Sequence, residues 1–215
     1  MTPNDDSDPH AEQPVLHVGP EPAAARLTAI FIHGRGASAD DILALAGELR
    51  LDDVAFLAPQ AAGNTWYPLS FLAPIDRNEP WLTSALGTVN RLVTTLEAQG
   101  IPSERIAIGG FSQGACLTLE SAARNPRRYA AVMGLSGGLI GPPGTPRSYP
   151  GSLAGTRVFL GCSDVDPHIP VERVRESATV LEQMGAFVDA RIYPRMGHTV
   201  NDDELAAMRA LLGSR

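Results

Sequence analysis

Hydrophobic and polar positions along the chain alternate between two patterns. Short, nearly continuous apolar runs are typical of strands buried on both faces of a parallel sheet, whereas apolar residues at every third or fourth position are typical of amphipathic helices. The runs predict strands at residues 27–32, 54–57, 105–108, 130–135, 157–160 and 187–192. The helical spacing predicts helices at about residues 42–49, 80–100, 113–124, 171–184 and 202–212.

Strands that alternate with helices over the whole length indicate an α/β fold, with a mostly parallel central sheet and helices on both faces. We assign residues 26–215 to this single domain. Residues 1–25 are rich in Pro, Asp, Glu and Ala and contain no basic side chain. We therefore interpret them as a flexible acidic tail, within which residues 15–18 are a candidate short first strand.

Two long stretches, residues 59–78 and 137–155, do not follow the alternation. Each leaves the end of a predicted strand, which is where such folds carry binding residues. The assigned elements leave no room for a separate lid domain in 215 residues. We therefore expect an open site that only these two loops shape.

The strongest chemical motif is G-x-S-x-G at residues 110–114, with the sequence GFSQG. It follows a predicted strand and precedes a predicted helix, which is the context of a nucleophile elbow. The glycines let the backbone make a strained tight turn that exposes the Ser112 hydroxyl above the sheet, in front of a helix N-terminus. We therefore predict that Ser112 is a nucleophile.

A serine nucleophile needs a base, and the chain offers five histidines. Hydrolases built on such a sheet place Ser, Asp and His in that order, each after a strand. His198 follows the last predicted strand and fits this order. The other four are His10, His17 and His33, which come too early in the chain, and His168, which lies in a loop and could reach the site.

The acid that orients the base should follow the strand at residues 157–160. Asp164 and Asp166 both qualify, and spacing alone does not choose between them. Such a carboxylate would hold the neutral tautomer of His198 and stabilise the imidazolium that forms during the reaction.

Donors for a developing oxyanion are expected at two places. The backbone N–H of Gln113 follows the nucleophile directly, and a second N–H should come from the loop at residues 33–37 after the first long strand. Glycines on both sides of Arg35 allow close approach of the backbone to a substrate. For the Arg35 side chain, contact with an anionic substrate and simple exposure remain open alternatives.

The substrate pocket is predicted from apolar residues in loops near strand ends. Trp66, Phe71 and Leu72 lie in the loop at residues 59–78, although Trp66 and Phe71 could instead pack that loop onto the body. Leu139 and Ile169 are further candidates. Cys116, one helical turn after Ser112, is interpreted as a small core residue.

The amino-acid composition excludes several reaction types and classes of partner. All 17 basic residues are Arg, and the absence of Lys excludes Schiff-base and pyridoxal phosphate chemistry, a Ser-Lys dyad and a P-loop. The net charge of −7 argues against nucleic acid or an anionic membrane as the partner. Five acids precede the first basic residue, Arg26, so the body is nearly neutral and the charge says little about the substrate.

Neither a metal nor a cofactor is expected, because no Cys/His cluster has the spacing of metal ligands. The two cysteines are too few for a disulfide framework. The N-terminus lacks the features of a signal peptide, and no apolar run reaches the ~20 residues that span a bilayer. We expect a cytoplasmic protein that does not insert into membranes.

Several blocks together resemble the phospholipase/carboxylesterase family of serine α/β-hydrolases, which includes bacterial carboxylesterases and acyl-protein thioesterases. They are IHGRG at 32–36, APQ at 58–60, GFSQG at 110–114, LSGG at 135–138, DPHIP at 166–170 and MGH at 196–198. The resemblance implies an α/β-hydrolase fold, selects Asp166 over Asp164 through the family's D-x-x-[VI]-P motif, and implies oxyanion donors at Arg35 and Gln113. It also makes a homodimer the expected assembly.

The resulting hypothesis is a serine carboxylesterase that acts on short- to medium-chain acyl esters of small molecules. An acyl thioesterase or a lysophospholipase is the alternative, and a ligand-binding protein without turnover is a remote one. Thioesterase-like members usually carry an acidic residue directly after the aromatic pair that corresponds to Trp66 and Tyr67. This chain has Pro68 there, which favours general esterase activity.

Overall fold

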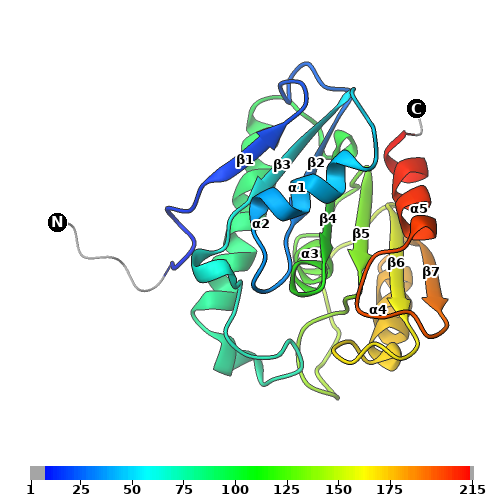
Figure 1. Ribbon diagram of the computed structural model, residues 1–215. Coiled ribbons are helices and arrows are strands. Elements are labelled where there is room, and N and C mark those ends of the chain that lie inside the picture. Colours follow the sequence, from blue (N-terminus) through cyan, green and yellow to red (C-terminus); the bar gives the residue numbers. More distant parts are fainter. Residues whose placement is uncertain (1–7, 214–215) are drawn as a thin grey trace.

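The computed structural model describes residues 8–213 and centres on a seven-stranded sheet in the order β1-β3-β2-β4-β5-β6-β7 (Figure 1). All neighbouring strands are parallel except β1 and β3, which are antiparallel. The predicted mostly parallel sheet is confirmed. The strands are β1 (Val15–Val18), β2 (Leu27–Ile32), β3 (Val54–Pro59), β4 (Ile106–Phe111), β5 (Ala131–Leu135), β6 (Arg157–Ser163) and β7 (Phe187–Tyr193).

Helices cover both faces of the sheet, as predicted (Figure 1). On one face lie α1 (Ala39–Gly47) and α5 (Asp202–Gly213), and on the other lie α2 (Trp81–Ala98), α3 (Gln113–Arg124) and α4 (Val171–Gln183). The short 3₁₀ turns are Ala62–Asn64, Ile75–Asn78 and Ser103–Arg105. The apolar runs form strands because β2 to β6 are buried on both faces, where continuous hydrophobicity is stabilising. Within residues 8–213, no helix combines the length and the apolar character that crossing a bilayer requires.

The N-terminal segment differs from the prediction of a flexible tail. Residues 15–18 form β1 on the edge of the sheet, and the Asp8 carboxylate binds Arg91 on α2 at 3.0 Å. The candidate strand at residues 15–18 is confirmed, and the interpretation as a flexible tail is wrong for the rest of residues 8–25. Its residues 1–7 lie outside the described part of the chain.

The contacts of His10 explain why the composition of the N-terminal segment did not reveal that it is ordered. Its side chain is 2% exposed and packs between the rings of Trp66 and Trp81. The ring nitrogen Nδ1 accepts the Ala62 N–H at 3.1 Å, so Nε2 carries the proton and donates to the Trp66 carbonyl at 3.0 Å. A polar, proline-rich composition does not reveal that one side chain ties the segment to a distant loop.

Candidate active site

Ser112 lies on a strained turn between β4 and α3. Its backbone has φ 55° and ψ −118°, in the left-handed half of the map that L-residues avoid. The turn is tight because β2 lies directly against it: a Cβ on Gly114 would come within 2.1 Å of the Ile32 carbonyl oxygen, and one on Gly110 within 2.5 Å of Gly114. Both positions therefore require glycine, and the G-x-S-x-G motif is a steric consequence of the elbow.

A chain of two hydrogen bonds joins the three residues that the sequence singled out. His198 Nε2 lies 2.8 Å from Ser112 Oγ, and His198 Nδ1 lies 2.7 Å from Asp166 Oδ2. With Nδ1 donating to the carboxylate, Nε2 accepts the serine proton. Ser112 follows β4, Asp166 follows β6 and His198 follows β7, so the parallel sheet brings the three together at its carboxyl edge.

The environment of Asp166 keeps it ionised. Burial acts to raise the pKa of this carboxyl, but hydrogen bonds from His198 and from the backbone N–H groups of His168 and Ile169 outweigh it and hold the pKa below its ordinary value. The side chain is 0% exposed. Asp164, the alternative acid, is exposed and accepts the Arg195 backbone N–H at 2.7 Å instead.

The two expected oxyanion donors lie in segments next to the elbow. Gln113 is the first residue of α3, so its N–H is one of the unpaired donors of a helix N-terminus. The loop that carries Arg35 packs on Ser112, since a Cβ on Gly34 would lie 3.4 Å from the serine Cβ. Among residues 8–213, no group accepts a hydrogen bond from either N–H.

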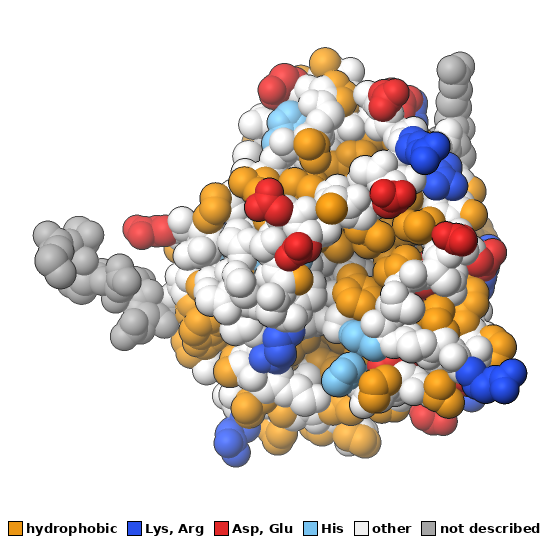
Figure 2. All heavy atoms as spheres, in the orientation of Figure 1, with side chains coloured by type: hydrophobic (Ala, Val, Ile, Leu, Met, Phe, Trp, Pro, Cys, Tyr) orange, Lys and Arg blue, Asp and Glu red, His pale blue; other side chains and the backbone are white. Residues whose placement is uncertain are grey.

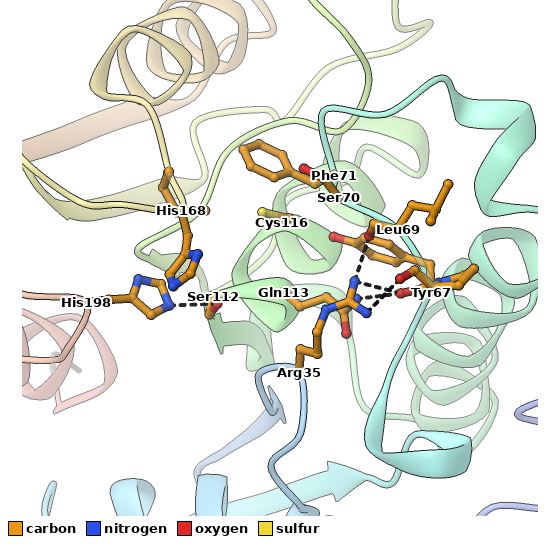
Figure 3. A pocket seen from close by; sticks show the side chains of 12 residues that line it. Arg35, Tyr67, Leu69, Ser70, Phe71, Ser112, Gln113, Cys116, His168 and His198 are labelled. Atoms are coloured by element: carbon orange, nitrogen blue, oxygen red, sulfur yellow. Dashed lines mark hydrogen bonds between the residues drawn. The ribbon is translucent and has the colours of Figure 1, made fainter.

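Arg35 is exposed, as one of the two alternatives from the sequence has it, and its guanidinium is bound to the protein. Its guanidinium donates to the carbonyl oxygens of Tyr67, Pro68 and Leu69 and to the Thr65 hydroxyl, over distances of 2.6–3.0 Å (Figure 3). One side chain thus binds four residues of the loop that follows β3, and the last three of these are consecutive. This positioning role is one that the sequence did not indicate.

Gln113 fastens the same loop from the other side. Its amide nitrogen donates to the Tyr67 carbonyl at 2.8 Å, and its amide oxygen accepts the Trp66 N–H at 2.9 Å. The two residues that are expected to donate to the oxyanion therefore also hold the loop at residues 65–69 through their side chains.

A cavity of about 430 Å³ opens beside Ser112 and His198. Figure 2 shows histidine side chains at the border of a hollow near the carboxyl edge of the sheet. The cavity combines apolar and polar groups. Its lining comprises Arg35, Tyr67, Pro68, Leu69, Ser70, Phe71, Ser112, Gln113, Cys116, His168, Ile169 and His198.

Of the predicted pocket residues, Phe71 and Ile169 line this cavity, and three others do not. Trp66 is 0% exposed and donates its indole N–H to the His33 carbonyl at 2.9 Å, so it packs the loop onto the body. Leu139 is buried in the core beneath α4, and Leu72 packs on that core from the side. For these three, the prediction of a pocket wall is wrong because apolar character does not distinguish a wall from a core.

Tyr67 and Leu69 belong to the apolar loop from Trp66 to Leu72 that the sequence indicates as a pocket wall, and both line the cavity. Ser70 lies in the same loop but was missed, because no local signal marks a polar residue there as part of the lining. Cys116 does line the cavity although it is only 1% exposed, so its core position and its pocket position coincide. His168 was recognisable, because it sits between the acid and a pocket residue in DPHIP. Its ring centroid lies 4.9 Å from that of His198.

The loop at residues 137–155 contributes no residue to the cavity lining, so the expectation that both long loops shape the site is wrong for this one. It lies over α3 and α4 instead, where Arg147 binds Glu176 at 2.9 Å and the Tyr149 hydroxyl donates to Glu120.

A second hollow, of about 350 Å³, lies on the other side of His198. Its walls are mostly apolar and come from α1, from the end of β4 and from the loop that carries His198. Its apolar contacts include Ile42, Leu45, Phe111 and Val200.

A mostly parallel sheet with a serine on the sharp turn after β4, bonded to a histidine after the last strand, defines an α/β-hydrolase of the serine hydrolase class. The chain belongs to the phospholipase/carboxylesterase family, whose model matches residues 15–213. It is a carboxylic ester hydrolase by this membership.

The relatives agree with that assignment. The chain is similar to a phospholipase/carboxylesterase structure from Dyadobacter fermentans, with 44% identity, a TM-score of 0.90 and coverage of 94% of this chain and 97% of that one. It is 30% identical to acyl-protein thioesterase 1 of Neurospora crassa over 95% of this chain and 93% of the relative. The structure of Zea mays acyl-protein thioesterase 2, at 20% identity and a TM-score of 0.69 over 93% of this chain and 97% of that one, shares the fold.

Proposed function

We propose that the protein is a serine carboxylesterase that hydrolyses short- to medium-chain acyl esters of small molecules. The observation that carries the proposal is the hydrogen-bonded chain from Ser112 through His198 to the ionised Asp166, placed at the mouth of a cavity. In this account Ser112 is the nucleophile, His198 the general base and acid, and Asp166 the group that orients His198.

The reaction has two halves. His198 Nε2 removes the proton from Ser112 Oγ as that oxygen bonds to the ester carbonyl carbon, and it then gives the proton to the leaving alkoxide. A water molecule next passes a proton to His198 and attacks the acyl-enzyme, and Ser112 leaves with its proton restored. In both halves the N–H groups of Arg35 and Gln113 stabilise the negative carbonyl oxygen, a contribution typically worth about 3 kcal/mol per donor.

The two hollows suggest how an ester lies in the site. Because His198 protonates the leaving oxygen, the alcohol portion must lie against this residue. The apolar hollow bounded by Ile42, Leu45 and Val200 adjoins His198 and would receive it. The cavity beside the oxyanion donors would then receive the acyl group.

A thioesterase is the second candidate, and the similarity to acyl-protein thioesterase 1 of Neurospora crassa favours it. The cavity favours shorter chains, because its volume is only about 430 Å³ and its lining mixes polar with apolar groups.

Steady-state kinetics test the proposal. With p-nitrophenyl butyrate, we expect Ser112→Ala to lower kcat by at least about 10⁴-fold and Asp166→Asn by on the order of 10³-fold or more. Asp164→Asn is the matched control and should stay within about threefold of the wild type. Hydrolysis that survives Ser112→Ala would contradict the proposal. Comparison of kcat/KM for p-nitrophenyl butyrate, butyryl-CoA and a lysophospholipid would separate the esterase from its alternatives.

A further inference from the structure

Among the buried side-chain polar atoms of the loop at residues 59–78, only the Tyr67 hydroxyl lacks a nitrogen or oxygen partner within residues 8–213. The carbonyl oxygens of Tyr67, Pro68 and Leu69 accept from Arg35, and the Ser70 hydroxyl accepts the Leu72 N–H. The Tyr67 hydroxyl, on a side chain only 1% exposed, has no nitrogen or oxygen partner within residues 8–213.

This hydroxyl points toward Cys116 on α3 (Figure 3). Burial raises the pKa of the Cys116 thiol to about 12 and holds the pKa of Tyr67 well above its ordinary value, so both groups stay neutral and the hydroxyl keeps its proton. A neutral thiol sulfur is a weak acceptor. The tyrosine is therefore a strong donor that faces a poor partner across the floor of the cavity.

The charge of the cavity favours an oxygen acceptor as the missing partner. Within the described part of the chain, no Asp or Glu lines it, and the ionisable nitrogen groups of its lining are those of Arg35, His168 and His198. A cationic substituent would meet repulsion there, whereas an ether, keto or hydroxyl oxygen would meet donors.

The position of the donor fixes where that oxygen must lie. Cys116 follows Ser112 by four residues, and its N–H donates to the Ser112 carbonyl at 3.0 Å, so it lies in the first turn of α3 beside the nucleophile. The Tyr67 hydroxyl, which points toward Cys116, therefore lies beside the part of the cavity into which an acyl chain bonded to Ser112 would extend.

We propose that the site is selective for esters of oxygenated acyl groups, in which an ether, keto or hydroxyl oxygen a few bonds beyond the carbonyl accepts a hydrogen bond from Tyr67. This inference rests on the proposed esterase function. It makes Tyr67 a specificity-determining residue that contacts the substrate away from the reacting atoms.

The test replaces single methylene groups of one acyl chain by oxygen. Wild type, Tyr67→Phe and Tyr129→Phe are assayed with p-nitrophenyl hexanoate and with its isosteres propoxyacetate, 3-ethoxypropanoate and 4-methoxybutanoate. For each ester, kcat/KM of the wild type is divided by kcat/KM of the variant, so that the intrinsic reactivity of the ester cancels. Tyr129 is the matched control, because it is equally buried but its hydroxyl donates to the Asn125 carbonyl outside the cavity.

For Tyr67→Phe we expect this ratio to be about tenfold higher with one of the three ethers than with hexanoate, for which it should be near or below one. Tyr129→Phe should give the same ratio with all four esters. A ratio for Tyr67→Phe that is uniform across the four esters would overturn the proposal, since a hydroxyl that only supports the loop or holds a water would act on all of them alike.

A binding series keeps this inference separate from the esterase proposal. The same four esters are titrated into Ser112→Ala and into Ser112→Ala/Tyr67→Phe, where no turnover is needed. Tighter binding of one ether that disappears with the Tyr67 hydroxyl supports the subsite even if wild type hydrolyses none of the esters, a result that would defeat the esterase proposal alone. Equal affinities in the two proteins would overturn the subsite.

Discussion

The two long loops of this protein both leave strand ends, yet they have different roles. Both contain several prolines, and only the loop at residues 137–155 is also rich in Gly. The loop at residues 59–78 walls the cavity because Arg35, Gln113 and His10 bind its backbone. The loop at residues 137–155 is fastened to α3 and α4 through Glu120, Arg147 and Arg173 and stays outside the cavity. Each loop is held in its place by side chains that come mostly from elsewhere in the fold.

Loss of the Arg35 side chain, which binds the loop at residues 59–78 from outside, should have the largest effect on activity. Arg35→Ala keeps the backbone N–H but loses all four hydrogen bonds to the loop, and misplacement of a cavity wall by about 1 Å costs on the order of 100-fold in kcat/KM. Arg147→Ala is the counterpart in the second loop. It should lower the free energy of unfolding by about 1–3 kcal/mol while kcat/KM stays within about twofold. Equal losses of activity in both variants would remove the distinction between the loops.

The hydrogen bonds at the two ends of the first loop should also differ in how much they contribute to kcat/KM. Gln113→Ala removes the bonds to Trp66 and Tyr67 at the cavity, and we expect kcat/KM to fall about tenfold, the equivalent of about 1.4 kcal/mol. Gln60→Ala removes the bonds to Ala39 and Asn64 at the outer end and should cost less than about threefold. A larger loss for Gln60→Ala in the same ester assay would show that the whole loop, and not its inner end, positions the site.

Within the first loop, a residue that lines the cavity and a residue that packs the loop onto the core should affect chain-length preference differently. Phe71→Ala enlarges the acyl cavity and should shift the preference between p-nitrophenyl acetate and hexanoate by about tenfold. Trp66→Phe keeps an aromatic ring in the core but loses the bond to the His33 carbonyl, so kcat/KM for both esters should change less than about threefold. A strong change of chain-length preference in Trp66→Phe would restore Trp66 to the pocket.

The smallest effect on activity is expected where His10 holds the loop from outside, and here stability is the readout. Burial lowers the pKa of His10 below 6.5, so the unfolded chain binds protons that the folded protein refuses. The stability of the folded protein is therefore fully present above pH 6.5 and falls as the pH drops below it. We expect His10→Phe to lower the free energy of unfolding at pH 8 by about 1–3 kcal/mol and to flatten its decline in acid.

Urea unfolding at pH 8 and at pH 5.5 measures both effects. His17→Phe, which changes an exposed histidine on β1, serves as the control and should change neither quantity. If His10→Phe matched His17→Phe, the N-terminal segment would not be held by this side chain.

The sequence predicts the buried strands, the turn at Ser112 and the place of His198, because each depends on residues that are near in the chain or on the order of the strands. Continuous apolar runs mark β2 to β6 because both faces of these strands are buried, and the glycines around Ser112 mark a turn that no other residue fits. His198 follows from the order of loops on a parallel sheet. These features depend on neighbours along the chain or on the topology alone.

What the sequence could not predict depends on partners far apart in the chain. Trp66 and Leu139 have the composition of a pocket wall, but their burial is set by His33 and α4. The acidic N-terminal segment has the composition of a tail, yet His10 ties it to Trp66, 56 residues away. Long-range hydrogen bonds of single side chains leave no periodic signal in the sequence.

The central claim is that Ser112, activated by His198, is the nucleophile of the esterase. The most direct measurement is labelling with a fluorophosphonate, followed by mass spectrometry of the digested protein. We expect one phosphonyl group per chain, on the peptide that contains Ser112, with labelling abolished in Ser112→Ala and slowed by at least about 100-fold in His198→Ala. A label on any other residue, or a labelling rate that His198→Ala leaves unchanged, would contradict the account.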